Sequence, residues 1–416
     1  MLTKPNIQDH LLQKLPMEVR NIFAIFGSEI RLVGGAVRDL LLDSKVHDFD
    51  FATTYQPLEV KKILIANNIK YVDLAEKFGT IIAIINGNNY EITTLRREYE
   101  YDGRHCQVEF SCDFLEDAKR RDFTINALYM DMNGKIYDYF SGLTDLKKKN
   151  LQFIGVSQQR ISEDYLRILR FFRFSVRFSS KLNQENLESC IYLQNNLKKL
   201  SKPRIRDEFL KIIANSNISS DRKKFSEALE VMQNKGFFIT LFETNLHLKR
   251  FFNLLELSKK LDLTVSQNLK IAALFIDDKI ELGKLKNNLC LTKKEFKYLK
   301  FCKDNYDVER NSDEFLEIMA NQDHDLIQDF YLFLQMRLDV EINMDKLKQT
   351  LDFFKEYMVA NFPIKGADIL QLDLENQDSP EHIGFALKKC KVAWIKSGFK
   401  MTKQELINMI DQIKSK

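Results

Sequence analysis

The stretch that most constrains this chain runs from Arg31 to Thr53, where a glycine pair and two carboxylates follow one another in order. Leu32 and Val33 predict a short apolar strand before the glycines, and the residues after them predict a helix that carries Arg38. Glycine adopts backbone angles closed to other residues, so amide N–H groups near Gly35 can point at an anion. Arg38 adds a fixed fork of positively charged donors, so we predict that both residues hold phosphate.

Asp48 and Asp50 form the second half of this pattern. They alternate with Phe49 and Phe51, which predicts a strand with both carboxylates on one side of a sheet. Mg²⁺ takes hard oxygen ligands and uses one or two carboxylates beside water and substrate phosphate. The pair therefore predicts a Mg²⁺ site for phosphoryl or nucleotidyl transfer. A solvent-facing pair beside an ordinary glycine turn is the alternative, and the order of the two halves favours the functional interpretation.

The same residues resemble a known family. Gly34 to Asp39, followed by Asp48 to Asp50, is similar to the signature of class II nucleotidyltransferases of the polymerase-beta type. This family contains the bacterial CCA-adding enzymes of tRNA and the poly(A) polymerases. The run Arg120 to Leu128 resembles its second motif, which implies that Arg121 contacts the nucleotide. Further matches are a third motif at Asp138 to Leu146, which we interpret as structural, and a fifth at Leu197 to Ile213.

A row of arginines follows in the segment from Ser162 to Phe178. At helical spacing the four arginines occupy about one third of the circumference, and apolar residues cover most of the rest; the arginines are Arg167, Arg170, Arg173 and Arg177. A helix that is apolar on most sides is buried, and buried arginines require anions. Structural carboxylates or a nucleoside triphosphate would both satisfy this requirement.

Asp164 precedes Arg167 by one helical turn, so we predict that their side chains are neighbours. A carboxylate accepts hydrogen bonds and a guanidinium donates them, which matches the amino group and ring nitrogen shared by cytosine and adenine. Guanine and uracil would leave buried groups unpaired, so such a pair selects CTP and ATP. The resemblance implies the same role for Glu163, Asp164 and Arg167, with Arg170 and Arg173 also contacting nucleotide.

The remaining pattern predicts an α/β head followed by helices. Helical spacing near Val19 to Phe26 and Leu58 to Asn67 accompanies a hairpin from Phe78 to Leu95, which together predict a mixed sheet with helices. The charged, aperiodic run Arg96 to Val108 predicts a mobile loop. Beyond residue 214 helical periodicity dominates. We predict a nucleotidyltransferase head of the polymerase-beta type and an all-α neck, body and tail, with the bounds 1–150, 151–214, 215–350 and 351–416.

Charge and composition limit the partners. The 416 residues carry a formal net charge of only +4, so any nucleic-acid surface needs a local concentration of Lys and Arg. Six lysines from Lys391 to Lys416 face only Glu405 and Asp411, which predicts a phosphate-backbone grip or a solvated helix face. The segment around Ile364 and Trp394 resembles a tRNA-binding tail, although the loop Gln371 to Glu381 departs from the usual pattern.

The cysteines show no metal-binding spacing, the first sixteen residues do not resemble a signal peptide, and no window predicts a membrane span. We therefore expect a cytoplasmic protein with reduced thiols and no membrane partner.

The resemblance, carried by motifs in the family's order, implies template-independent addition of CCA to tRNA 3′ ends from CTP and ATP. One alternative is a poly(A) polymerase, but that branch usually carries a Gly-Arg-Arg-Phe-like element where this chain has Phe78-Gly79-Thr80. The other alternative is a catalytically silent RNA-binding protein on the same fold. Whether all three nucleotides are added, and the oligomeric state, stay open at this point.

Overall fold

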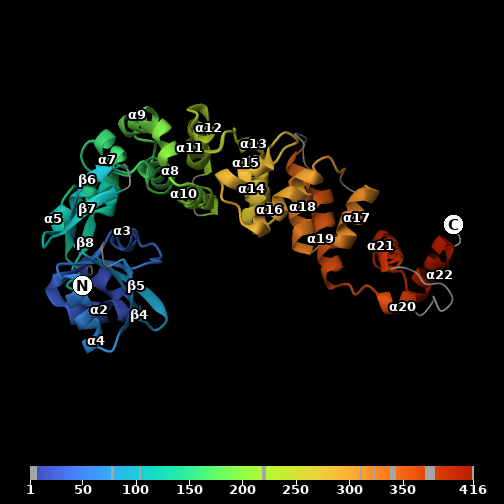
Figure 1. Ribbon diagram of the computed structural model, residues 1–416, viewed down its shortest axis with the longest axis horizontal. Coiled ribbons are helices and arrows are strands. Elements are labelled where there is room, and N and C mark those ends of the chain that lie inside the picture. Colours follow the sequence, from blue (N-terminus) through green and yellow to red (C-terminus); the bar gives the residue numbers. More distant parts are fainter. Residues whose placement is uncertain are drawn as a thin grey trace, which may run out of the picture. The chain divides into compact units, whose positions relative to one another are not determined.

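The computed structural model describes residues 7–75, 79–102, 105–217, 222–309, 312–322, 324–337, 343–370 and 380–414. Its contacts divide the chain into two compact units, Met1–Leu241 and Phe242–Lys416 (Figure 1), and each unit is described by itself. The finer four-part division expected from the sequence stays a prediction.

A seven-stranded mixed sheet forms the head of the first unit. The strand order is β3-β4-β5-β2-β1-β8-β9, and the described neighbours run antiparallel except for the parallel pair β2 and β5. The strands are β1 (Ile30–Val33), β2 (Asp50–Thr53), β3 (Lys70–Ala75), β4 (Thr80–Ile85), β5 (Asn88–Thr94), β8 (Leu128–Met130) and β9 (Ile136–Asp138). This sheet confirms the predicted mixed α/β head.

Four helices belong to the same part of the unit: α1 (Ile7–Gln13), α2 (Met17–Phe26), α3 (Gly35–Leu41) and α4 (Pro57–Ala66). Phe51 of β2 is buried in the main cluster and meets Phe23 of α2 edge to face at 5.6 Å. Ala52 belongs to a second cluster around Tyr129, as expected for successive residues of a strand. The opposite faces of β2 therefore fix its register, and Asp50 shares its side with Ala52.

The helices predicted near Val19 to Phe26 and Leu58 to Asn67 are confirmed by α2 and α4. The predicted hairpin is confirmed by β4 and β5, whose turn residues Asn86 and Gly87 both have positive φ. Such angles are typical of the two-residue turns that match strand twist. Phe78, the first residue of the predicted hairpin, lies outside the described residues.

The predicted mobile loop from Arg96 to Val108 is wrong for the residues that the structure describes. They form an antiparallel two-stranded sheet of β6 (Arg96–Asp102) and β7 (His105–Phe110). Arg97 lies opposite Glu109, and the two side chains form an ion pair at 2.5 Å. Backbone hydrogen bonds and cross-strand charge pairs stabilise such a ribbon without an apolar period, which is why the hydrophobic pattern gave no signal.

The third motif supports the turn before α6 (Gly142–Lys148). Asp138, at the end of β9, accepts hydrogen bonds from the backbone N–H groups of Gly142 and Leu143 at 2.8 and 2.9 Å. A Cβ atom at Gly142 would lie 2.3 Å from the carbonyl oxygen of Thr124, so no larger residue fits without displacement of the backbone. The third motif therefore packs directly against the second, in agreement with a structural role.

Helices complete the first unit. They are α5 (Phe114–Lys119), α7 (Ser157–Glu163), α8 (Leu166–Phe178), α9 (Gln184–Leu193), α10 (Lys202–Ala214), α11 (Arg222–Asn234) and α12 (Phe237–Phe242), the last of which ends at the boundary between the units. The apolar residues of α8 are buried; Phe171 stacks on Phe153 and Phe174 meets Phe123 edge to face. This burial was expected from the apolar circumference of the segment.

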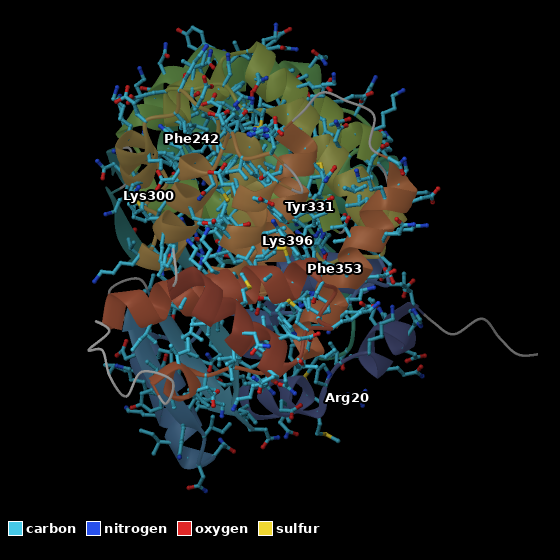
Figure 2. The ribbon with its side chains drawn as sticks, turned by 90° about the vertical axis from the view of Figure 1, so that its right-hand side faces the viewer. Arg20, Phe242, Lys300, Tyr331, Phe353 and Lys396 are labelled. Carbon is cyan, nitrogen blue, oxygen red and sulfur yellow. The ribbon has the colours of Figure 1, made fainter. Side chains whose placement is uncertain are left out.

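The described residues of the second unit are helical, as predicted. The helices are α13 (Leu248–Lys260), α14 (Gln267–Phe275), α15 (Leu282–Asn288), α16 (Lys293–Asp304), α17 (Asp313–Asn321), α18 (His324–Arg337), α19 (Met344–Val359), α20 (Gly366–Leu370), α21 (Pro380–Lys396) and α22 (Lys403–Lys414). Aromatic rings join several of them: Tyr331 of α18 contacts Phe354, and Phe353 stacks on Phe399 at 4.8 Å (Figure 2). Within the described ranges, no helix is long and apolar enough to cross a membrane.

Ion pairs within this unit engage some of the C-terminal lysines. Lys396, labelled in Figure 2, contacts Asp313 at 2.5 Å, and Lys403 contacts Asp368 at 2.6 Å. The sequence count of lysines against Glu405 and Asp411 did not include these distant carboxylates. The surplus positive charge of the segment is therefore smaller than its local composition indicates.

We expect Gly142→Ala to destabilise the protein by about 1–3 kcal/mol, because its Cβ would overlap the backbone of Thr124. The matched control is Gly283→Ala in α15, where nothing lies within 4 Å of the added carbon. That control should be neutral or slightly stabilising, since alanine favours helix. Chemical denaturation of both variants tests this, and equal midpoints would contradict the close packing of the two motifs.

Candidate active site

The glycine turn brings the first and second motifs together. Gly34 has φ of 71°, and its N–H donates to the carbonyl oxygen of Leu128 at 3.0 Å. A Cβ atom at Gly34 would lie 3.4 Å from Nη1 of Arg121 and from the carbonyl oxygen of Asn126. Glycine therefore serves two needs here, the left-handed backbone angle and the close approach of the guanidinium. Gly35 then begins α3.

Arg38 lies beside this turn but is held by protein groups. Only 4% of the residue is exposed, and its Nε and Nη2 each lie 2.9 Å from Oδ1 of Asp39. Its Nη1 also donates to the side chain of Asn126, and the ring of Phe178 lies 4.2 Å from Cζ. Burial lowers the pKa of Arg38, opposed by the charge of Asp39. The structure thus places Arg38 at the turn, with its guanidinium already engaged.

The two predicted carboxylates lie at the start of β2. The strand begins at Asp50, whereas Asp48 is exposed and precedes it, so the prediction that both belong to the strand is wrong for Asp48. Asp50 pairs in register with Glu91 of the parallel strand β5. The pKa of Asp50 is raised to about 6, mainly by burial and then by the negative charges of Glu91 and Asp48. The positive charge of Arg121 opposes this rise.

Gathered negative charge of this kind fits a divalent cation, which would relieve the repulsion that raises the Asp50 pKa. Within the residues that the structure describes, no group of three or more His, Cys, Asp or Glu side chains is placed to hold a metal. Mg²⁺ is commonly held by one or two carboxylates with water and substrate phosphate, so Asp48 and Asp50 suit that ion by chemistry and number.

Arg121 is fixed by a buried carboxylate that the sequence analysis missed. Its Nε and Nη2 contact Oδ2 of Asp117 at 3.1 and 3.0 Å, and the Tyr129 hydroxyl donates to the same oxygen at 2.7 Å. Burial raises the pKa of Asp117, but the charges of Arg121 and Arg120 more than offset it and hold this pKa below its ordinary value. The spacing of Asp117 before Arg120 and Arg121 on a helix face could have indicated this contact.

Each arginine of α8 contacts a protein carboxylate. The pairs are Arg167 with Glu163 at 2.5 Å, Arg170 with Asp122 at 2.6 Å, Arg173 with Glu208 at 2.7 Å, and Arg177 with Asp39 at 3.1 Å. The structural alternative considered for these arginines is therefore present, and their burial does not require a nucleotide. The side chains of Arg170 and Arg177 remain 31% and 30% exposed, so both stay accessible to a ligand.

Asp122, the partner of Arg170, has a second polar contact. It also accepts a hydrogen bond from the side chain of Asn126 at 3.0 Å. Burial raises its pKa, but Arg170 and Asn126 more than offset this and lower the pKa to about 2. Asp122 is therefore ionised at neutral pH. For Arg173 burial outweighs the ion pair: burial lowers the pKa of Arg173 to about 10, and the charge of Glu208 opposes this only in part.

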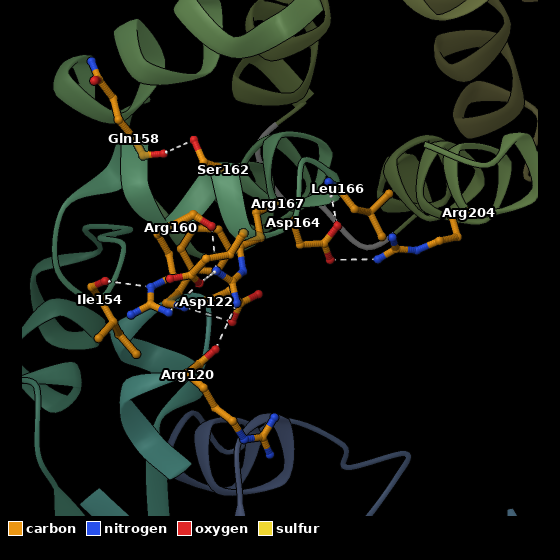
Figure 3. A network of polar contacts seen from close by, with 12 residues as sticks. Arg120, Asp122, Ile154, Gln158, Arg160, Ser162, Asp164, Leu166, Arg167 and Arg204 are labelled. Carbon is orange, nitrogen blue, oxygen red and sulfur yellow. Dashed lines mark hydrogen bonds and ion pairs between the residues drawn. The ribbon is translucent and has the colours of Figure 1, made fainter. Parts of the chain in front are cut away.

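The sequence analysis predicted that the side chains of Asp164 and Arg167 are neighbours, but each contacts other residues instead (Figure 3). Helix α7 ends at Glu163 and α8 begins at Leu166, so Asp164 lies in the break between them. Its Oδ1 accepts from the N–H of Leu166 at 3.1 Å, and its Oδ2 accepts from Nη2 of Arg204 at 2.7 Å. The prediction assumed one continuous helix, whereas Asp164 lies just after the first of two helices and accepts a hydrogen bond from the first residue of the second.

The side chain of Arg167 donates three hydrogen bonds. Its Nη1 donates to the carbonyl oxygen of Arg160 at 2.6 Å and to Glu163 at 2.5 Å, and its Nη2 donates to the carbonyl oxygen of Arg120 at 2.9 Å (Figure 3). Arg167 therefore joins α8 to the second motif. Arg204 of α10, which holds Asp164, was not singled out from the sequence, although it lies in the fifth motif.

Comparison with known proteins agrees with this arrangement. A family model described as the Poly A polymerase head domain matches residues 30–152. The chain is 32% identical over 414 residues to "CCA tRNA nucleotidyltransferase 1, mitochondrial" of Mus musculus, which covers 98% of this chain and 92% of the mouse protein. The chain belongs to the CCA tRNA nucleotidyltransferase family. The resemblance of its motifs to the CCA-adding and poly(A) polymerase family is thereby confirmed at the level of the family.

Further relatives of this nucleotidyltransferase chain match somewhat less than half of its length or share its fold. A CCA-adding enzyme of Lactobacillus johnsonii is 43% identical over 188 residues, which are 45% of this chain and 46% of that protein. The Bacillus stearothermophilus CCA-adding enzyme, solved in complex with CTP, superposes with a TM-score of 0.70 at 22% identity and covers 99% of this chain and 98% of that one. This likeness supports the fold, with its polymerase-beta-type head and helical remainder.

Acid should destabilise the nucleotidyltransferase through Asp122. An aspartate has a pKa of about 3.9 when unfolded, and that of Asp122 is lowered to about 2 in the folded chain. Asp122 contributes fully to the free energy of unfolding at pH values above its pKa in the unfolded chain. This contribution is lost as the pH falls through its pKa in the folded chain. We expect roughly 1–3 kcal/mol to be lost between about pH 4 and pH 2.

Asp122→Asn should flatten this part of the pH dependence, because the variant has no proton to bind there. Denaturant unfolding of wild type and variant at several pH values between 2 and 7 measures the difference. If the free energy of unfolding fell equally steeply with pH in both proteins, the Asp122–Arg170 pair would not be the source of the acid sensitivity.

Proposed function

We propose that this chain adds CCA to the 3′ ends of tRNA from CTP and ATP without a nucleic-acid template. The observation that carries this proposal is the 32% identity that extends over nearly the full length of both this chain and the mouse CCA tRNA nucleotidyltransferase. The gathering of the glycine turn, Arg121 and Asp50 on neighbouring parts of one sheet supports it. The substrates are the tRNA 3′ end and the two nucleoside triphosphates.

Asp48 and Asp50 would hold Mg²⁺ at the start of β2. The metal would lower the pKa of an attacking hydroxyl and stabilise the leaving pyrophosphate. The backbone N–H of Gly35 and the guanidinium of Arg121 would bind the triphosphate, with Arg121 already aligned by Asp117. Arg38 would act at the same end by supporting the turn while Asp39 and Asn126 keep it in place.

Asp164 and Arg167 would select the base. Asp164 lies in the break between α7 and α8, and Arg167 lies in the first turn of α8. Arg204 holds Asp164, and Glu163 holds Arg167, so each enters the site from a fixed position. A carboxylate that accepts and a guanidinium that donates fit the shared edge of cytosine and adenine. Arg170 and Arg173 would contact the same nucleotide from the next turns of α8.

Two finer points belong to this proposal. We place the chain with the bacterial class II enzymes and in the cytoplasm, although its relatives include mitochondrial enzymes of animals as well as Lactobacillus enzymes. We also favour CCA addition over poly(A) synthesis, because the relatives that match nearly the whole chain are CCA tRNA nucleotidyltransferases. Incubation with tRNA that ends at the discriminator base and single nucleoside triphosphates decides between them: long A tails without CTP use would favour poly(A) synthesis.

Asp50→Asn should reduce nucleotide addition at least about 10³-fold, because the variant keeps the shape of the side chain and loses its charge. The matched control is Asp43→Asn, an exposed carboxylate of the same head with φ of 54°, which asparagine tolerates. Incorporation of labelled CTP into tRNA at saturating Mg²⁺ measures both. Full activity of Asp50→Asn would exclude Asp50 as a catalytic residue, and a wild type without activity at saturating Mg²⁺ would favour a silent RNA-binding protein.

Asp164→Ala should relax base selection rather than abolish transfer. We expect the ratio of kcat/KM for CTP over UTP to fall at least about tenfold, since a lost hydrogen bond no longer penalises the wrong base. Arg204→Gln should change the ratio in the same direction, because Arg204 holds Asp164. Asp207→Ala, an exposed carboxylate on the same helix as Arg204, is the control. Unchanged ratios in Asp164→Ala would contradict base selection by this residue.

A further inference from the structure

The hydroxyl of Tyr129 takes part in a closed triangle of hydrogen bonds with Arg121 and Asp117. It accepts from Nε of Arg121 at 3.1 Å and donates to Oδ2 of Asp117 at 2.7 Å, and the same Nε contacts that Oδ2 at 3.1 Å. Burial raises the pKa of Tyr129, so its hydroxyl keeps the proton that it donates. The Tyr129 hydroxyl therefore contacts both members of the ion pair.

Asp117 alone does not fix Arg121 in the way that a carboxylate with two available oxygens would. Its Oδ1 accepts from Nε and Nη2 of Arg120, at 2.8 and 2.6 Å, and both contacting nitrogens of Arg121 share Oδ2. An arginine that meets both oxygens of a carboxylate gains geometric specificity from two parallel hydrogen bonds. Arg121 meets only one of them, and the oxygen of Tyr129 supplies its second acceptor.

Tyr129 is itself fixed to the sheet that carries Asp50. It lies in β8, which pairs with β1, and β1 pairs in turn with β2, whose first residue is Asp50. The ring of Tyr129 is fully buried and meets those of Phe114 and Tyr139 edge to face at 5.7 and 5.9 Å. Arg121 follows α5 and lies outside the strands. Tyr129 therefore ties the guanidinium group of Arg121 to this sheet.

The remaining nitrogen of Arg121 faces the glycine turn. A Cβ atom at Gly34 would lie 3.4 Å from Nη1, whereas the contacts with Asp117 use Nε and Nη2. The Arg121 side chain is 21% exposed, so a ligand at this turn can reach it. A guanidinium edge beside backbone N–H groups suits phosphate oxygens. The orientation of Arg121 thus determines where Nη1 meets a phosphate.

We propose that Tyr129 is a positioning residue for triphosphate binding and acts through Arg121. This inference rests on the proposed function, in which Arg121 holds the phosphates of CTP and ATP. The triphosphate is common to all nucleotides, so the orientation of Arg121 changes the affinity for each of them by the same factor and leaves the choice of base unchanged. Arg121 would contact the phosphates in substrate and transition state alike, so loss of its orientation raises KM and leaves kcat nearly unchanged.

Tyr129→Phe tests this inference, because it removes only the hydroxyl. We expect the Kd values of CTP and ATP, measured by equilibrium dialysis with Mg²⁺ and without tRNA, to rise by the same factor of about three to ten. In nucleotide addition the KM values should rise alike, while kcat and the CTP/UTP ratio of kcat/KM change by less than about twofold. KM does not depend on the concentration of active enzyme, so a partial loss of stability leaves this comparison valid.

The matched control is Tyr139→Phe. Tyr139 packs against Tyr129, but its hydroxyl accepts from Nη1 of Arg31 at 2.9 Å. This variant loses a hydroxyl from the same aromatic cluster and should bind CTP like wild type. A second control is the Arg121→Lys background, in which Tyr129→Phe should change the Kd of CTP by less than about twofold, because the hydroxyl acts through Arg121.

Equal Kd values of wild type and Tyr129→Phe would overturn the inference. An equal rise in Kd in the wild-type and Arg121→Lys backgrounds would also overturn it, since the hydroxyl would then act independently of Arg121. Different factors for CTP and ATP would have the same consequence, because the base would then be involved. A wild type that binds both nucleotides but adds neither to tRNA would overturn the proposed function alone, since the comparison of Kd values would still stand.

Discussion

The pairing of buried arginines with carboxylates determines how the first unit of this nucleotidyltransferase is assembled. The apolar side chains of α8 must be buried, and this burial draws four guanidinium groups away from solvent as well. Their partners come from different parts of the chain, namely α3, the second motif, α7 and α10. A single helix therefore contacts α3, which follows the glycine turn, near its C-terminal end and α7 near its N-terminal end. Loss of any one carboxylate would leave a partly buried guanidinium group without its charge partner.

This arrangement bears on the contacts that we propose between these arginines and a nucleotide. A row of unpaired guanidinium groups would repel one another and depend on ligand to fold, whereas paired groups are already ordered before ligand arrives. Arg170 contacts Asp122 through Nε and Nη2, which leaves the other edge of its planar group to be approached. Preorganised donors cost no reorganisation when the substrate binds. The carboxylates thus serve the fold and the site together.

The sequence predicted the features that depend on neighbouring residues and failed where distant residues meet. The glycine turn, the helices α2 and α4 and the hairpin of β4 and β5 all have local patterns that period and turn chemistry make visible. Arg204 and Glu208 have no such pattern, because their partners Asp164 and Arg173 lie on other elements. The break at Asp164 was missed for a related reason: helical spacing continues across it, and only the capping hydrogen bond to Leu166 shows where the second helix begins.

Two adjacent residues join the chemistry at the sheet to the helix that carries the arginines. Arg121 contacts Asp117 and lowers the pKa of Asp50, whereas the next residue, Asp122, contacts Arg170 of α8. Because the chain turns between them, their side chains engage opposite sides of the site without any intervening element. A displacement of this dipeptide would move the phosphate end and the base end of a bound nucleotide together. Under the proposed function, the second motif would set the distance between Asp50 and the residues proposed to select the base, and its close packing on Gly34 and Gly142 would keep that distance fixed.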